Sequence, residues 1–181
     1  PIMSLNLFHS AYELVDSFWA GKMGADAISA ISVTFPIMFF TMAVISGITI
    51  ATSIVISQYK GKQDEGKIKF ISSQMLVFVS ILSIVIAILG YFLCGPLLRL
   101  AGVHGYILDN GIIYTRISMI GIPFVYIFYV FQSIEKGLGN MKKSMILMAV
   151  SSLLNACLDP LFIFTFKLGI AGDALVTIMA Q

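Results

Sequence analysis

The sequence predicts an all-α integral membrane protein, a bundle of five transmembrane helices followed by the start of a sixth. Of its 181 residues, 59% are hydrophobic and only 11% are charged, and the mean hydropathy is +0.98. A soluble domain carries about 25% charged residues, so this chain has too little polar surface to cover a soluble globule. Its apolar residues also form runs of the length that a membrane-crossing helix needs, which is about 20 residues.

Five runs qualify as spans, and a sixth begins near the end of the chain. The second and third contain no charge, the fourth holds Arg116 near its start, and the fifth is interrupted at Asp159-Pro160. The predicted spans are 1–20, 30–57, 70–98, 112–134 and 144–166, with a truncated sixth at 173–181. Because the chain does not begin with Met and its last apolar run has barely begun, we expect it to be a piece of a longer protein.

Basic residues are distributed unevenly between the two sets of loops. The loops after the second and fourth spans contain seven: Lys60, Lys62, Lys67, Lys69, Lys136, Lys142 and Lys143. The opposite side has four: Lys22, Arg99, Arg116 and Lys167. Short cytoplasmic loops collect Lys and Arg. We therefore expect a multi-pass protein of the cytoplasmic membrane whose N-terminus is in the cytoplasm.

The two lysine-rich loops also contain residues that end helices. Gly61 and Gly66 flank the first loop, and Gly137 and Gly139 precede Asn140 in the second. Glycine and asparagine are typical of helix stops and tight turns. These loops are therefore predicted to be short connections between antiparallel helices.

Charge and cysteine content exclude several functions. The net charge of +2 is small and dispersed, which argues against a nucleic-acid partner. Cys94 and Cys157 lie inside apolar runs, so neither indicates a disulfide framework or a metal site. We find no nucleophile–base pair, metal-ligand spacing or nucleotide loop in the sequence. We therefore expect neither enzymatic activity nor a cofactor.

The first predicted span carries a polar stripe. At about 100° per residue, Asn6, His9, Glu13 and Asp16 lie within an arc of about 80°, and Tyr12 extends it. A charge in the middle of the membrane costs at least about 2.5 kcal/mol, so such a face is expected to line a cavity. Three alternatives remain: Asp16 as an interfacial residue, Glu13 as an incidental acid in a wet cavity, and His9 as a packing residue.

The fifth predicted span carries a matching stripe. Ser151, Asn155 and Asp159 follow one another at about one helical turn and share a face. Pro160 has no N–H to donate to the Ala156 carbonyl and clashes with it, which opens the helix beside Asp159. Oxygen atoms of this kind suit a small cation or a proton, and broken helices at membrane depth mark transporter sites. The alternative is that Asp159 only ends the helix before Pro160.

Five segments, in order along the whole chain, resemble motifs of the multidrug and toxin extrusion (MATE) family. They are Tyr12–Asp16, Gln58–Gly61, Gly137–Asn140, Asn155–Phe164 and Gly169–Thr177. The resemblance implies a transporter of two six-helix lobes, twelve helices in all, that opens alternately to the two sides of the membrane. This chain would be most of the N-terminal lobe, and the C-terminal lobe of the same protein would be its partner.

The resemblance is to the prokaryotic DinF-like branch, whose coupling-cation site falls here on Asp16, Asn155, Asp159 and Thr177. Thr177 is implied by the resemblance alone. Two residues depart from the family pattern, because Glu13 replaces an expected asparagine and His9 an expected glutamine. Both can hold protons, which leaves H⁺ and Na⁺ open as the coupling ion. No other metal is expected.

The favoured function is a cation-coupled antiporter that extrudes small organic compounds. The alternative is a flippase for a lipid-linked precursor or oligosaccharide of the same wider superfamily, whose cavity we would expect to carry Arg and Lys for pyrophosphate. The predicted intramembrane charges here are Glu13, Asp16 and Asp159, with Arg116 alone at an edge. Their sign favours a cationic substrate, and membrane lipid is the other expected contact.

Overall fold

The computed structural model describes residues 25–162, 172, 175, 176 and 178. Within them the chain forms four helices: α2 (Ala25–Gly61), α3 (Glu65–Leu100), α4 (Gly105–Gly137) and α5 (Met141–Pro160). All four are long and apolar enough to cross a membrane. Four of the five predicted full spans are therefore helical, and these residues contain no strand. The first predicted span lies outside the described residues, as does most of the sixth.

The helices differ in length from the apolar runs that predicted them. Helices α2, α3 and α4 contain 37, 36 and 33 residues, and each extends beyond its run at both ends. At about 1.5 Å per residue α2 is about 55 Å long, whereas the hydrocarbon core is about 30 Å thick. The apolar run is long enough to span the hydrocarbon, and helical hydrogen bonding continues past it. The α-helical part of the fifth span, α5, ends at Pro160, and Leu161 and Phe162 form a wider π-helical turn; residues 163–166 of the predicted span lie outside the described residues.

Local caps explain where the helices begin and end. The side chain of Asp64 accepts a hydrogen bond from the backbone N–H of Lys67 at 3.0 Å and so caps the start of α3. In this loop Gln63 takes the left-handed conformation, with a φ of 56°, whereas Gly66, which the sequence suggested as a turn residue, lies inside α3. Gly139 has a φ of 83° and turns the chain between α4 and α5.

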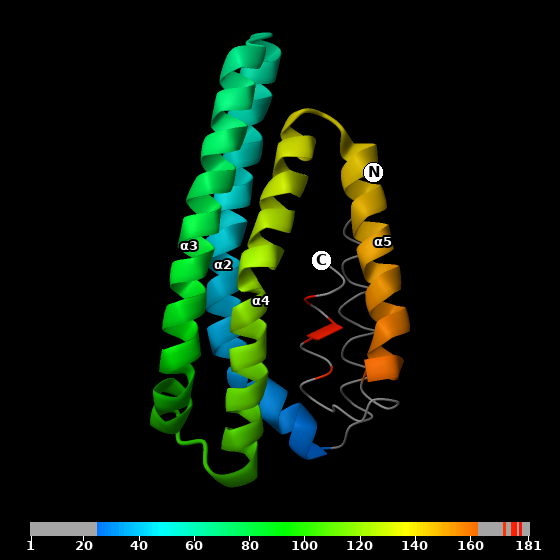
Figure 1. Ribbon diagram of the computed structural model, residues 1–181. Coiled ribbons are helices and arrows are strands. Elements are labelled where there is room, and N and C mark those ends of the chain that lie inside the picture. Colours follow the sequence, from blue (N-terminus) through cyan, green and yellow to red (C-terminus); the bar gives the residue numbers. More distant parts are fainter. Residues whose placement is uncertain (1–24, 163–171, 173–174, 177, 179–181) are drawn as a thin grey trace.

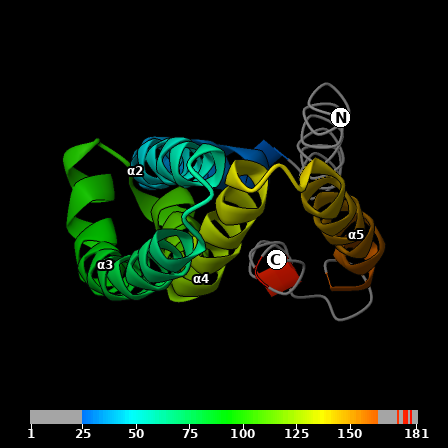
Figure 2. The same ribbon diagram turned by 90° about the horizontal axis from the view of Figure 1, so that it is seen from above.

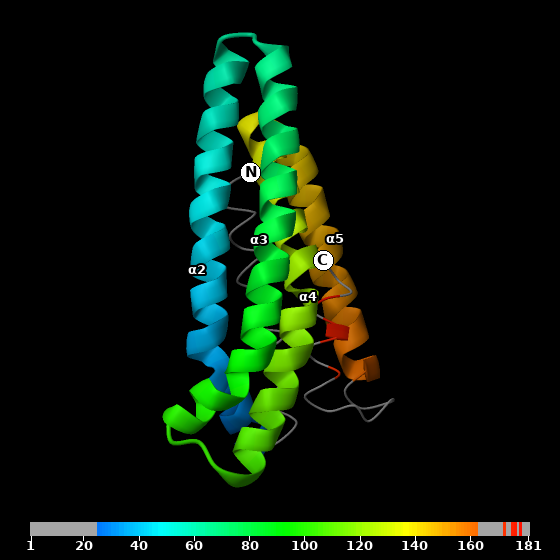
Figure 3. The ribbon, with the colours of Figure 1, turned by 60° about the vertical axis from the view of Figure 1, so that its left-hand side comes forward.

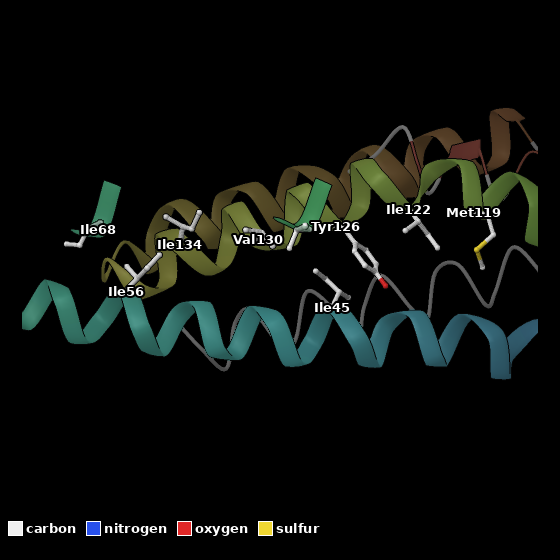
Figure 4. Close-up of a cluster of buried hydrophobic side chains, with 9 residues drawn as sticks. Ile45, Ile56, Ile68, Met119, Ile122, Tyr126, Val130 and Ile134 are labelled. Atoms are coloured by element: carbon white, nitrogen blue, oxygen red, sulfur yellow. The ribbon is translucent and has the colours of Figure 1, made fainter. Parts of the chain in front are cut away.

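Helix α4 is the centre of the bundle. Seen from above, it lies between the α2–α3 pair and α5 (Figure 2). Half of its most apolar stretch is buried, against 22% for α2 and 11% for α3. The core joins α4 to α2 and α3, and in Figure 4 Tyr126 of α4 points toward α2 beside Ile45. The outer faces of α2 and α3 expose large apolar side chains such as Phe40 and Phe92, as lipid-facing helices do.

Two glycines let helices approach closely. A Cβ atom at Gly137, the last residue of α4, would lie 2.8 Å from the backbone oxygen of Ser53 and 2.9 Å from Cβ of Ile56 in α2. Gly121 of α4 packs against the side chain of Ile178. Small residues commonly bring membrane helices into contact in this way.

The two lysine-rich loops lie at the same end of the bundle. Figures 1 and 3 show the α2–α3 and α4–α5 connections at one end and the α3–α4 connection at the other. The seven basic residues that the sequence assigned to one side of the membrane therefore share one end, here called the lysine-rich end. This arrangement follows from helices that run antiparallel in succession.

Candidate functional site

The structure describes only part of the predicted cation site. Asn155 is in α5 and is 0% exposed, and Asp159 lies one turn later in the same helix. Six predicted residues lie outside the described part of the chain: Asp16, Thr177, Asn6, His9, Tyr12 and Glu13. The side chain of Asp159 also lies outside it. The meeting of the Asp16 and Asp159 carboxylates therefore stays a prediction.

Helix α5 presents Asn155 on a buried polar face. Ser144, Ser151 and Asn155 are at most 5% exposed, whereas Leu153 and Leu154 of the same helix are 66% and 46% exposed. The polar residues share one side because their spacings of seven and four residues are close to whole helical turns. Position 159 continues this face, and α5 ends one residue later at Pro160. Asn155 and position 159 are thus one turn apart near the end of α5.

Helix α4 contributes a buried carboxamide opposite this face, which sequence reasoning missed. Gln132 is 3% exposed, and its Nε2 donates a hydrogen bond to the sulfur of Met148 in α5 at 3.8 Å. A thioether is a weak acceptor, so this amide is only loosely held. The signal that could have identified it is a carboxamide inside the apolar run 112–134, because polar side chains in membrane helices commonly bond across helices.

A second missed group lies at the lysine-rich end. The carboxylate of Glu135 accepts a hydrogen bond from Nδ2 of Asn140 at 2.8 Å, and its other oxygen lies 3.9 Å from Nζ of Lys143. The Glu135 side chain is only 12% exposed, whereas that of Lys143 is 68% exposed. The sequence predicted only a short connection between antiparallel helices in this region. The structure instead places a nearly buried acid between α4 and α5.

Other buried hydroxyl groups form hydrogen bonds within or between the helices. Thr34, Thr52 and Thr115 each donate to a backbone carbonyl three or four residues earlier in the same helix. The hydroxyl of Tyr126 donates to the carbonyl of Thr41 and joins α4 to α2. These groups are satisfied by local or interhelical bonds and leave no donor for a ligand.

A groove of about 460 Å³ lies on the other side of the bundle, between α2 and α3. Phe40, Leu89 and Leu93 line it, and Met119 of α4 is part of its lining. Arg116 is outside this groove, and its guanidinium lies 4.9 Å from the centre of the Tyr91 ring. That position suits a cation–π contact at an exposed site. The lining of the groove is apolar, so it does not provide the oxygen ligands that a cation needs.

Known proteins match the whole chain. The MatE family model matches residues 1–161. The chain is 34% identical over 183 residues to "Probable multidrug resistance protein YpnP" of Bacillus subtilis (strain 168), covering 100% of this chain and 41% of that protein.

Two solved structures of a multidrug resistance MATE family transporter of the MOP superfamily also match, each at 27% identity. The outward-facing one has a TM-score of 0.93 and covers 99% of this chain and 40% of that chain. The inward-facing one has a TM-score of 0.89, and the match covers 94% of this chain and 39% of that chain.

The chain thus spans about two fifths of the length of these relatives. Its four apolar helices follow the same fold, and the matched family residues include α2, α3, α4 and all of α5. The chain is a multi-pass membrane protein segment and belongs to the MatE family.

Proposed function

We propose that this chain is the N-terminal lobe of a multidrug efflux antiporter that uses an H⁺ or Na⁺ gradient to extrude organic cations. Its relative YpnP and the matching solved transporters are named for multidrug resistance, which supports efflux of drugs. Because those proteins are more than twice as long, a C-terminal lobe of the same protein would complete the transporter. The proposed location is the cytoplasmic membrane, with the lysine-rich end facing the cytoplasm.

The observation that carries this proposal is the burial of Asn155. Its side chain is 0% exposed in an apolar helix, four residues before Asp159 and five before the end of α5. Polar and ionisable residues at membrane depth are expensive to insert and are usually functional. A carboxamide oxygen beside a carboxylate provides hard ligands for Na⁺ or an acceptor for a proton.

Asp16 and Thr177 complete the proposed site. Two carboxylates that lie close together in a low dielectric resist ionising at the same time, so Asp16 and Asp159 would share a proton or a cation. Binding of that ion would favour one conformation of the lobe, and binding of the drug would favour the other. The membrane potential contributes about 2.3 kcal/mol per charge per 100 mV, in addition to the ion gradient.

The charge of the proposed cavity indicates the substrate class. Glu13, Asp16 and Asp159 are acids, so a cavity that contains them would attract cationic compounds. Apolar side chains around them would accept varied aromatic bodies, since such surfaces tolerate ligands of different shape.

The test is efflux of ethidium, an organic cation, from vesicles that contain the full-length protein, with H⁺ and Na⁺ gradients applied separately. We expect one gradient to drive efflux and Asp159→Asn to abolish it, because this change removes a charge and keeps the shape. Asp109→Asn is the matched control, since Asp109 is exposed near the start of α4. Wild-type rates in Asp159→Asn vesicles would show that the coupling role is wrong.

A further inference from the structure

A line of buried residues runs along α5 from Asn155 toward the lysine-rich end. Ser144, Met148, Ser151 and Asn155 follow one another at spacings of four, three and four residues, which places them within an arc of about 60°. Their exposed fractions are 0%, 8%, 5% and 0%. At about 1.5 Å per residue the line covers about 16 Å, or about half the hydrocarbon thickness.

Ser144 behaves differently from the other buried hydroxyl groups. Its Oγ atom is buried and has no hydrogen-bond partner within the part of the chain that the structure describes. Thr34, Thr52 and Thr115, in contrast, all donate to carbonyls of their own helices. A buried hydroxyl without a partner is costly, so it indicates a binding partner of another kind. An ion, or a water molecule that accompanies it, has the required chemistry.

Gln132 lies beside Met148, which is the one apolar residue in this line. Met148 separates Ser144 from Ser151, and the Gln132 amide of α4 lies against its sulfur at 3.8 Å. Because a thioether is a weak acceptor, the amide can turn toward a better partner at little cost. The methionine side chain is flexible and can move aside. The Gln132 amide thus places one polar group beside the apolar residue of the line.

Glu135 lies at the outer end of the same line. It follows Gln132 by three residues on α4, which places the two on neighbouring positions of one helix face. Its carboxylate is 12% exposed and contacts Asn140 and Lys143 of the loop and of α5. A nearly buried carboxylate attracts cations, and the exposed ammonium of Lys143 can leave it when a cation arrives.

We propose that this face, the α5 track, conducts the coupling cation between the Asn155–Asp159 site and the lysine-rich side of the membrane. The track consists of Ser144, Met148, Ser151 and Asn155 of α5 with Gln132 and Glu135 of α4. It rests on the proposed function, because it supplies the ion to that site. Its hydroxyl, carboxamide and carboxylate oxygens suit Na⁺ or a proton carried by water.

The first test measures whether water reaches the track. In full-length protein with Cys94 and Cys157 replaced by alanine, Ser144→Cys and Ser151→Cys are treated with a charged, membrane-impermeant thiol reagent from the lysine-rich side. The control is Leu153→Cys, because Leu153 lies on the exposed face of the same helix. We expect the track cysteines to react at least about tenfold faster, since only a hydrated thiol ionises. Equal rates would overturn the proposal.

The second test measures conduction. Ser144→Ala and Gln132→Leu should lower the initial rate of gradient-driven ethidium efflux about tenfold and leave the Kd for ethidium unchanged, because each removes a polar step of the path. Ser144→Thr keeps the hydroxyl and should keep the rate. Ser152→Ala is the matched control, since the Ser152 hydroxyl donates to the Met148 carbonyl in its own helix. Wild-type rates in both track variants would refute conduction.

The two tests separate this inference from the function on which it rests. If the wild-type protein shows no efflux under either gradient, the proposed function is wrong, while the thiol rates still decide whether the track is open. If efflux is driven by a gradient but Ser144→Cys reacts no faster than Leu153→Cys, the antiporter stands and the track is rejected.

Discussion

The contact between the end of α4 and α2 predicts that Gly137→Ala destabilises the lobe. An added Cβ would lie 2.8 Å from the backbone oxygen of Ser53 and 2.9 Å from both Cβ and Cγ2 of Ile56. None of these atoms is the free end of a flexible side chain, so the clash is relieved only if the two helices move apart. Ile56 is 0% exposed, and any separation also loosens its packing.

The size of the effect follows from two opposing contributions. Overpacking of a tight contact costs about 1–3 kcal/mol. Replacing glycine by alanine in a helix returns about 0.5–1 kcal/mol, because glycine loses more backbone freedom on folding. The midpoints of these two ranges give a net expected loss of about 1.3 kcal/mol, which corresponds to a fall in Tm of about 3–5 °C for a unit of this size.

The assay is thermal unfolding of the purified full-length protein in detergent, followed by size-exclusion chromatography of the remaining folded fraction. Gly47→Ala is the matched control, because Gly47 lies inside α2 and a Cβ there meets nothing within 4 Å. That variant should keep or slightly raise the Tm. A Gly137→Ala protein that melts at the same temperature as Gly47→Ala would refute the reasoning about the contact.

Two further changes test how the helices are held. Tyr126→Phe removes the hydroxyl that donates to the Thr41 carbonyl. We expect the free energy of unfolding to fall by about 0.5–1.5 kcal/mol, seen as a lower Tm in the same assay. An unchanged Tm would mean that this bond contributes nothing to stability. Asp64→Ala removes the acceptor for the Lys67 N–H, and we expect the free energy of unfolding to fall by about 0.5–2 kcal/mol. Asp64→Asn is the control, because it keeps a capping oxygen. Equal stability of the two variants would contradict the cap.

The sequence by itself determined the class of the protein and which apolar runs of the described residues form helices long enough to cross a bilayer. In hydrocarbon each backbone N–H and C=O must be bonded within the protein, so a long apolar run has to form a helix. The sequence also singled out Asn155, because it lies one helical turn before Asp159 and Pro160, whereas Gln132, a carboxamide without such neighbours along the chain, was missed. The helix lengths could not be predicted equally well, since helices continue beyond the hydrocarbon until a cap such as Asp64 begins or ends them.

Only the tertiary structure decided which side of each helix faces protein. The runs of α2 and α3 contain no charge and have large apolar side chains on all sides, so lipid and core satisfy these side chains equally and the sequence shows no preferred face. For that reason the central position of α4, the Gly137 contact with α2, and the pairing of Gln132 with Met148 were not predictable. The sequence shows that residue 135 is a glutamate, but the burial of its carboxylate depends on α5 lying beside it.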